Sequence, residues 1–146
     1  MPMITLTTTA GALTEKGRRT VKKDLVWSLM RWEGAPDTEF FRSQSWCHLV
    51  ELPEDGQCTA EDDEPRFLVE ATIPQGGMSE RRKGGIAEEV TGIVLEAAGL
   101  DEEHAGRVWV LFDEKPDGTW AVGGHLFRFS ELLTLAESER GETDGD

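Results

Sequence analysis

The sequence predicts an α+β fold in which two tandem β-α-β repeats form a four-stranded sheet with two helices on one face. A shift of 65 positions aligns Thr14 with Ser79 and also aligns Gly34 with Gly99. These matches at one shift indicate an internal repeat. Each half contains an extended run, a helical pattern and a second extended run. A chain of 146 residues with 38% hydrophobic content can bury one core. We therefore expect a single domain over residues 1–134.

The first repeat spans residues 2–56. Residues 3–7 form an extended run, and residues 46–52 form the second one. Thr14 is a good helix N-cap, and Gly34 is suited to end the helix in a left-handed conformation. Between these caps the apolar residues recur at helical spacing: Val21, Leu25, Leu29 and Trp32.

The second repeat spans residues 66–130 and has the same order of elements. Residues 68–72 form its first extended run, Ser79 is the helix N-cap, and residues 108–112 form its last extended run. The apolar residues of its helix are Ile86, Val90, Ile93 and Ala97. The acidic segment 57–65 is expected to link the two repeats.

Two further expectations concern the surface. A single layer of helices leaves one face of the sheet bare, so oligomerisation is the natural way to bury that face. The C-terminal segment 135–146 has no apolar residue after Ala136 and carries many acidic side chains. Such composition is typical of a disordered tail.

Composition excludes several classes of function. The 15 basic and 29 acidic residues give a formal charge of −14, which repels nucleic acids and anionic membranes. No apolar stretch is long enough to span a bilayer, and the N-terminus lacks the pattern of a signal peptide. Cys47 and Cys58 have no metal-binding or disulfide spacing. We expect a cytoplasmic protein with reduced thiols, no cofactor and no metal.

Three motifs resemble those of the tautomerase superfamily. Residues 77–83, Gly-Met-Ser-Glu-Arg-Arg-Lys, are similar to the helix start of 4-oxalocrotonate tautomerases. Glu114 and the Trp-Ala-Val-Gly-Gly sequence at 120–124 resemble the C-terminal motif of the same family. Residues 34–37 resemble the corresponding stretch of malonate semialdehyde decarboxylase. The resemblance covers about residues 2–130, and extends to the fused cis-3-chloroacrylic acid dehalogenases. It implies a fold like that of macrophage migration inhibitory factor and, for a chain of this length, a homotrimer.

The resemblance also implies a catalytic role for Pro2. Once Met1 is removed, Pro2 presents a secondary amine at the head of the first strand. An α-amino group titrates near pH 8, and burial lowers its pKa because the charged form loses hydration. The neutral amine is then a general base for keto-enol isomerisation.

The sequence departs from the family at the residues that hold a substrate carboxylate. The position of the family's arginine before the second helix is Met78, its counterpart in the first half is Leu13, and a second arginine position falls on Trp109. The fused dehalogenases carry a histidine in the first helix, and the corresponding position here is near Leu29. Trp120 occupies the family's active-site aromatic position, and with Met78 and Trp46 or Trp109 it predicts an apolar pocket.

Two polar residues complete the predicted site, each with a structural alternative. Glu39 matches the acidic position of the decarboxylase, but it is also an ordinary acid in the first turn of a helix. Gln75 is placed to donate a hydrogen bond near Pro2, although a role in a turn explains it equally well.

The sequence therefore predicts an isomerase acting on an apolar enol or keto acid that is monoacidic or neutral. One alternative is a hydratase or decarboxylase of the same fold, with protonated Pro2 and Glu39. Another is a non-catalytic trimeric ligand-binding protein that retains Pro2 by descent; the missing arginines support this alternative.

Overall fold

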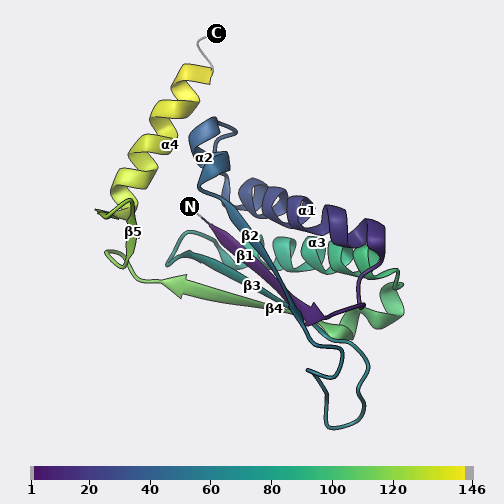
Figure 1. Ribbon diagram of the computed structural model, residues 1–146. Coiled ribbons are helices and arrows are strands. Elements are labelled where there is room, and N and C mark those ends of the chain that lie inside the picture. Colours follow the sequence, from purple (N-terminus) through teal and green to yellow (C-terminus); the bar gives the residue numbers. More distant parts are fainter. Residues whose placement is uncertain (1, 144–146) are drawn as a thin grey trace.

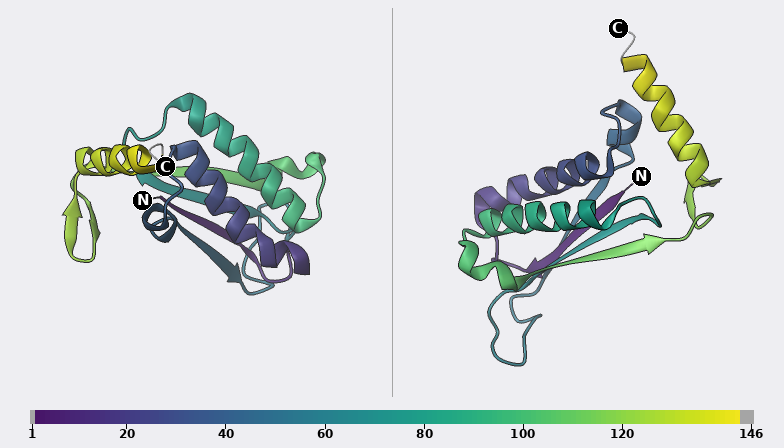
Figure 2. Two further views of the ribbon diagram at one scale, coloured as in Figure 1. Left: turned by 90° about the horizontal axis from the view of Figure 1, so that it is seen from above. Right: turned by 180° about the vertical axis from the view of Figure 1, so that it is seen from behind.

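The computed structural model describes residues 2–143 and contains a mixed four-stranded sheet with two long helices on one face (Figures 1 and 2). The order across the sheet is β2-β1-β3-β4. β1 is parallel to β2, β3 is parallel to β4, and the central pair β1 and β3 is antiparallel. The strands are β1 (Met3–Thr9), β2 (Trp46–Leu52), β3 (Phe67–Pro74) and β4 (Val108–Lys115). The predicted fold class is confirmed.

The two helices repeat with the shift seen in the sequence. α1 (Glu15–Glu33) and α3 (Glu80–Ala98) each have 19 residues and begin 65 positions apart. The Thr14 side chain accepts a hydrogen bond from the first turn of α1, as Ser79 does for α3. Gly34 and Gly99 end the helices at φ angles of 75° and 67°, where a side chain would be strained. No helix in residues 2–143 is long and apolar enough to cross a membrane.

The core lies between these helices and the sheet. Inward-facing residues alternate along each strand, for example Ile4 and Leu6 in β1 and Val69 and Ala71 in β3, all at most 1% exposed. They pack against the apolar faces of the helices: Val21, Leu25, Leu29, Ile86, Val90 and Val94. The helical spacing in the sequence therefore identified most of the buried helix face.

The opposite face of the sheet is uncovered in the single chain, as the two-layer prediction required (Figure 2). Side chains that alternate with the core residues point outward there. Trp109 is 68% exposed and Trp46 is 55% exposed, and Val50 and Leu111 are also exposed. Large apolar side chains gathered on one face are typical of a surface that binds another protein chain.

The chain also contains elements that the repeat did not predict. They are the short helix α2 (Glu39–Ser43), the 3-10 helix η1 (Glu102–Arg107), the hairpin of β5 (Trp120–Val122) and β6 (His125–Phe127), and the helix α4 (Phe129–Thr143).

The prediction of a disordered tail over 135–146 is wrong for residues 135–143, which belong to α4. Ala136 of that helix is buried against Met30 and Phe41, and Leu135 packs beside them. The apolar residues at the start of α4 anchor an acidic segment whose composition alone suggested disorder. Residues 144–146 lie outside the described part of the chain.

Candidate functional site

Pro2 is buried at the N-terminal end of β1, between the two neighbouring strands. Its carbonyl oxygen accepts a hydrogen bond of 3.1 Å from the backbone nitrogen of Trp46. The next residue, Met3, pairs with Trp46 of β2 on one side and Thr72 of β3 on the other. The start of β1 therefore lies beside the start of β2 and the end of β3, near α2 (Figure 1).

A cavity of about 420 Å³ adjoins this position, and we call it the Pro2 cavity. Pro2 and Met3 line it together with Trp46, Gln44 and residues 120–123 of the β5 segment. The turn between β4 and β5 thus brings Trp120 to the start of β1, although 118 positions separate Pro2 and Trp120. Pro2, Trp46 and Trp120, all named from the sequence, meet here.

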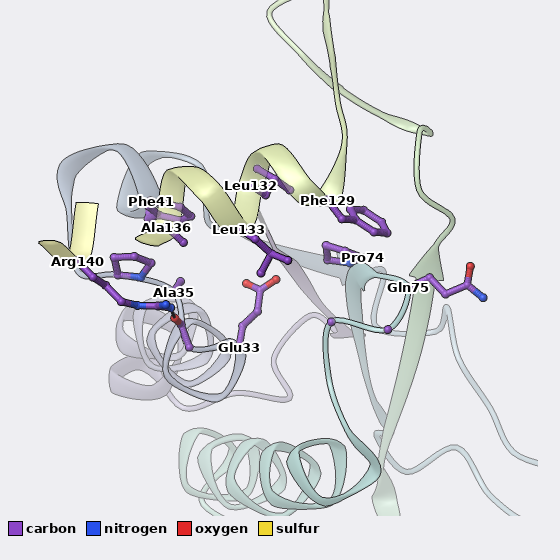
Figure 3. A pocket seen from close by; sticks show the side chains of 14 residues that line it. Glu33, Ala35, Phe41, Pro74, Gln75, Phe129, Leu132, Leu133, Ala136 and Arg140 are labelled. Atoms are coloured by element: carbon purple, nitrogen blue, oxygen red, sulfur yellow. Dashed lines mark hydrogen bonds between the residues drawn. The ribbon is translucent and has the colours of Figure 1, made fainter. Parts of the chain in front are cut away.

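A second cavity, of about 380 Å³, lies at the same end of the molecule, and we call it the Glu33 cavity (Figure 3). Its walls are the end of α1, the turn at residues 74–77 after β3, and α4. Most of the lining is apolar: Ala35, Pro36, Phe41, Pro74, Phe129, Leu132, Leu133 and Ala136. Since β3 pairs with β1, the turn at 74–77 follows directly on the strand next to Pro2.

Glu33 projects its carboxylate into this second cavity, below Leu133 of α4 (Figure 3). Its Oε2 atom is out of contact with solvent and has no hydrogen-bond partner in the described part of the chain. Burial raises the pKa of the Glu33 carboxyl, and the positive charge of the chain's amino terminus acts in the opposite direction. The site therefore contains an acid with a buried carboxyl oxygen and a pKa raised above the usual value.

Arginines from two other helices approach the end of α1. Arg82 of α3 donates a hydrogen bond of 3.4 Å to the carbonyl oxygen of Glu33. Arg140 of α4 donates to the carbonyl oxygen of Gly34 and lines the Glu33 cavity. Both contacts satisfy carbonyl groups at the C-terminus of α1, where positive charge is favourable.

The structure separates other residues that the sequence had grouped. Met78 is only 4% exposed and belongs to the main core, so it lines neither cavity. Trp109 lies on the outer face of β4, beside a different cavity with Cys58 and Arg66. The predicted grouping of Met78 and Trp109 with Trp120 is therefore wrong within a single chain.

The two predicted polar residues also lie away from Pro2. Glu39 is exposed in the first turn of α2, the place that the structural alternative gave it, and lines neither cavity. Gln75 lines the rim of the Glu33 cavity, but its side chain points away from the interior (Figure 3).

Sequence reasoning missed Glu33, although two features of the sequence point to it. A glutamate in the last turn of a helix opposes the helix dipole. Its counterpart in the second repeat, 65 positions later, is Ala98. The fold therefore does not require an acid at this position.

Among residues 2–143, no group of three or more histidine, cysteine, aspartate or glutamate side chains is arranged to hold a metal ion. Two groups suited to proton transfer lie at these cavities: the amine that Pro2 presents once Met1 is removed, and the carboxyl of Glu33.

Comparison with known proteins agrees with this geometry. Residues 68–130 match the family model described as Tautomerase enzyme. The structure of N1, a member of the cis-3-chloroacrylic acid dehalogenase family, superposes with a TM-score of 0.72 at 20% identity, covering 99% of each chain. The second half of the chain thus matches the tautomerase family, and the whole chain shares the fold of N1. The superposition on N1 extends through α4, so the C-terminal helix is part of the shared fold.

Two other solved structures are similar. Pt0534, inactivated by 2-oxo-3-pentynoate, has a TM-score of 0.71 at 17% identity, with 88% of this chain and 98% of that chain covered. The Q0 fused 4-OT, a symmetric trimer, has a TM-score of 0.70 at 19% identity, with the same coverage. No curated protein sequence matches the chain. At these identities the structural likeness establishes the fold alone.

Proposed function

We propose that this protein is a tautomerase in which the amine of Pro2, freed by removal of Met1, transfers a proton between the carbon and oxygen ends of an enol. The observation that carries the proposal is the position of Pro2: buried, at the head of a central strand, and in a cavity shared with Trp120. Burial disfavours the charged form of an amine and so favours a general base.

The lining of the two cavities supports an apolar substrate with at most one carboxylate. Trp46 and Trp120 offer flat apolar surfaces in the Pro2 cavity. Arg140 is the one cation among the described residues that line the Glu33 cavity, and the described lining of the Pro2 cavity contains none. A compact dicarboxylate would leave a charge without a partner, at a cost of several kcal/mol.

We also propose that the active form is a homotrimer in the cytoplasm. The exposed apolar face of the sheet supports association, and the Q0 fused 4-OT of the same fold is a trimer. In such an assembly, residues of a neighbouring copy would complete a site that is open in the single chain. The free thiols Cys47 and Cys58 support a reducing compartment.

The hydratase or decarboxylase alternative with Glu39 receives less support, because Glu39 is exposed and lines neither cavity. The binding-protein alternative predicts that the amine of Pro2 is dispensable. One set of variants distinguishes these functions.

The test is the ketonisation of phenylenolpyruvate by wild type and Pro2→Ala, after mass spectrometry has verified loss of Met1. We expect Pro2→Ala to remain assembled and to lose about 100-fold or more in turnover, the contribution of one acid-base group. An N-terminal extension, which converts the amine to an amide, should be equally inactive. Pro53→Ala, in an exposed loop, is the matched control and should keep wild-type activity.

Covalent labelling gives an independent readout. Incubation with 2-oxo-3-pentynoate, the compound that inactivated Pt0534, should modify the wild-type N-terminus and spare the extended protein. Turnover that survives both Pro2→Ala and the extension would eliminate the tautomerase proposal in favour of a binding protein.

A further inference from the structure

Glu33 occupies a position where the fold does not require an acid. Its Oε2 atom is out of contact with solvent and has no hydrogen-bond partner in the described part of the chain, so it loses hydration without compensation. The equivalent position in the second repeat, 65 residues later, is the apolar residue Ala98 at the end of α3. A buried polar atom without a partner is rare in folded proteins, and where it faces a cavity it indicates a functional site.

The Glu33 cavity has the size and lining of a site for a small ligand. Its volume of about 380 Å³ lies in the range of small-molecule pockets, and its walls come from the end of α1, the turn at 74–77 and α4. The carboxylate of Glu33 points into it below Leu133 (Figure 3). Among the described residues, none lines both this cavity and the Pro2 cavity. The Glu33 cavity can therefore hold a ligand of its own while a substrate occupies the Pro2 cavity.

The charged groups around Glu33 come from three other parts of the chain. Arg82 of α3 and Arg140 of α4 donate hydrogen bonds to the backbone carbonyls of Glu33 and Gly34, not to the carboxyl oxygen Oε2. The positive charge of the amino group of Met1 lowers the pKa of the carboxyl, but this group is lost where Met1 is removed. Within residues 2–143, no cation donates a hydrogen bond to Oε2.

We propose that the Glu33 cavity binds a primary amine with an apolar body, whose ammonium group donates a hydrogen bond to the carboxylate of Glu33. An ammonium supplies both a donor and a counter-charge, and hydrogen bonds between charged groups are about twice as strong as neutral ones. The apolar body would lie against Phe129, Leu132 and Leu133. The formal charge of −14 attracts cations at long range. This inference does not depend on the amine of Pro2.

Other classes of ligand fit the cavity less well. A carboxylic acid would bring a like charge beside Glu33, which disfavours the ionised form of both groups. A diamine would carry a second ammonium without a partner, because Glu33 is the one acid among the described residues that line the cavity. A neutral alcohol can donate a hydrogen bond but leaves the buried charge uncompensated. The chemistry of the lining therefore favours a monoamine.

Binding of an ammonium should depend on pH through Glu33. Burial raises the pKa of its carboxyl, whereas a bound ammonium favours the ionised form. An alkyl ammonium resembles the lysine side chain, which titrates near pH 10.4, so the ligand stays charged in neutral and acidic solution. The affinity should therefore fall as the pH is lowered through the raised pKa of Glu33.

The test is isothermal titration calorimetry of the full chain with 2-phenylethylamine, 2-phenylethanol and 3-phenylpropionate. These probes share one apolar body and end in a cationic, a neutral or an anionic group. We expect the amine to bind best, and Glu33→Gln to lower its affinity about tenfold or more and to abolish its acid dependence. Glu96→Gln, which changes an exposed acid near the end of α3, is the matched control and should bind like the wild type.

A second variant occupies the site from within. Leu133 is 65% exposed and lies above the carboxylate of Glu33, so Leu133→Lys should fold normally and place a tethered ammonium beside Glu33 (Figure 3). We expect this variant to lose binding of 2-phenylethylamine. Its matched control is Leu126→Lys, because Leu126 is also an exposed leucine but lies outside the cavity lining.

Three results would overturn the inference: an amine affinity that Glu33→Gln leaves unchanged, tighter binding of 3-phenylpropionate than of the amine, or no saturable amine binding by the wild type at millimolar concentration. Pro2→Ala should bind 2-phenylethylamine as the wild type does. A failure of the tautomerase proposal and a failure of the amine site are therefore distinguishable.

Discussion

The indole nitrogen of Trp32 donates a hydrogen bond of 2.8 Å to the carboxylate of Glu89, and so joins the helices of the two repeats. Arg31 donates to the other carboxylate oxygen at 2.8 Å, and the hydroxyl of Ser28 donates to the same oxygen as Trp32. The ring of Trp32 also lies against Gly85, where a Cβ atom would come within 2.2 Å of it. One polar cluster and one close contact therefore fix how α1 packs on α3.

This cluster predicts a pH-dependent stability. Burial alone would raise the pKa of Glu89, but the hydrogen bonds from Ser28, Trp32 and Arg31 outweigh burial and lower the pKa. Because the folded pKa lies below the unfolded value, the stabilisation is present above that value and is lost as pH falls through the folded pKa. We expect Glu89→Gln to unfold about 1 kcal/mol more easily at pH 7, since the carboxylate is partly exposed.

Urea denaturation between pH 3 and pH 7 checks this expectation. The difference between wild type and Glu89→Gln should shrink in acid, where both side chains are neutral. Glu88→Gln, at the exposed neighbouring position, should show no such trend. A constant difference over the whole range would contradict the role of the ionised carboxylate.

The contact between Gly17 and Ala97 supplies a second prediction. A Cβ atom on Gly17 would lie 2.0 Å from the carbonyl oxygen of Ala97, so Gly17→Ala has to move α1 away from α3. We expect a loss of about 2 kcal/mol in unfolding free energy. Gly84→Ala is the matched control in α3, where nothing lies within 4 Å, and it should gain about 1 kcal/mol from helix propensity. Equal effects in denaturant titration would contradict the proposed contact.

The repeated part of the fold was predictable because its determinants are local. Helix caps at Thr14 and Ser79, glycine ends at Gly34 and Gly99, and the apolar spacing between them all lie within single elements. A tandem repeat then restricts the topology, since each β-α-β unit has one favoured handedness. The four-stranded sheet and its two helices followed from these features.

The site was only partly predictable because it is assembled from distant segments. Trp120 reaches Pro2 after the turn at residues 116–119, in which Gly118 has a positive φ. The resemblance to the family placed Met78 in the pocket, but its side chain is buried in the main core. Glu33 was missed because the sequence did not predict the helix α4, which forms one wall of its cavity.

The packing of α4 predicts that the C-terminal segment is needed for stability. Removing residues 135–146 would expose the buried faces of Met30 and Phe41 and remove Ala136 and Arg140 from the lining of the Glu33 cavity. We expect a lower melting temperature and increased binding of a hydrophobic dye. Removing 144–146 alone is the control and should change neither measurement. An unchanged melting temperature after the longer deletion would show that α4 contributes nothing to stability.

The last prediction concerns the bare face of the sheet. Trp109 is 68% exposed in the single chain, on the side opposite the helices, and Leu111 follows it on the same face. If copies of the chain cover this face in a trimer, Trp109→Lys would bury a charge in the interface at a cost of several kcal/mol. We therefore expect the variant to dissociate in light scattering while its far-ultraviolet circular dichroism stays native.

The matched control is Trp27→Lys, because Trp27 is also an exposed tryptophan but lies on α1, away from the bare face of the sheet. It should remain a trimer. Dissociation should also lower turnover, since residues of a neighbouring copy would be withdrawn from the open cavities near Pro2. A Trp109→Lys protein that stays trimeric would mean that the assembly uses another surface. A wild type that is a stable 16 kDa monomer in light scattering would contradict the proposed trimer.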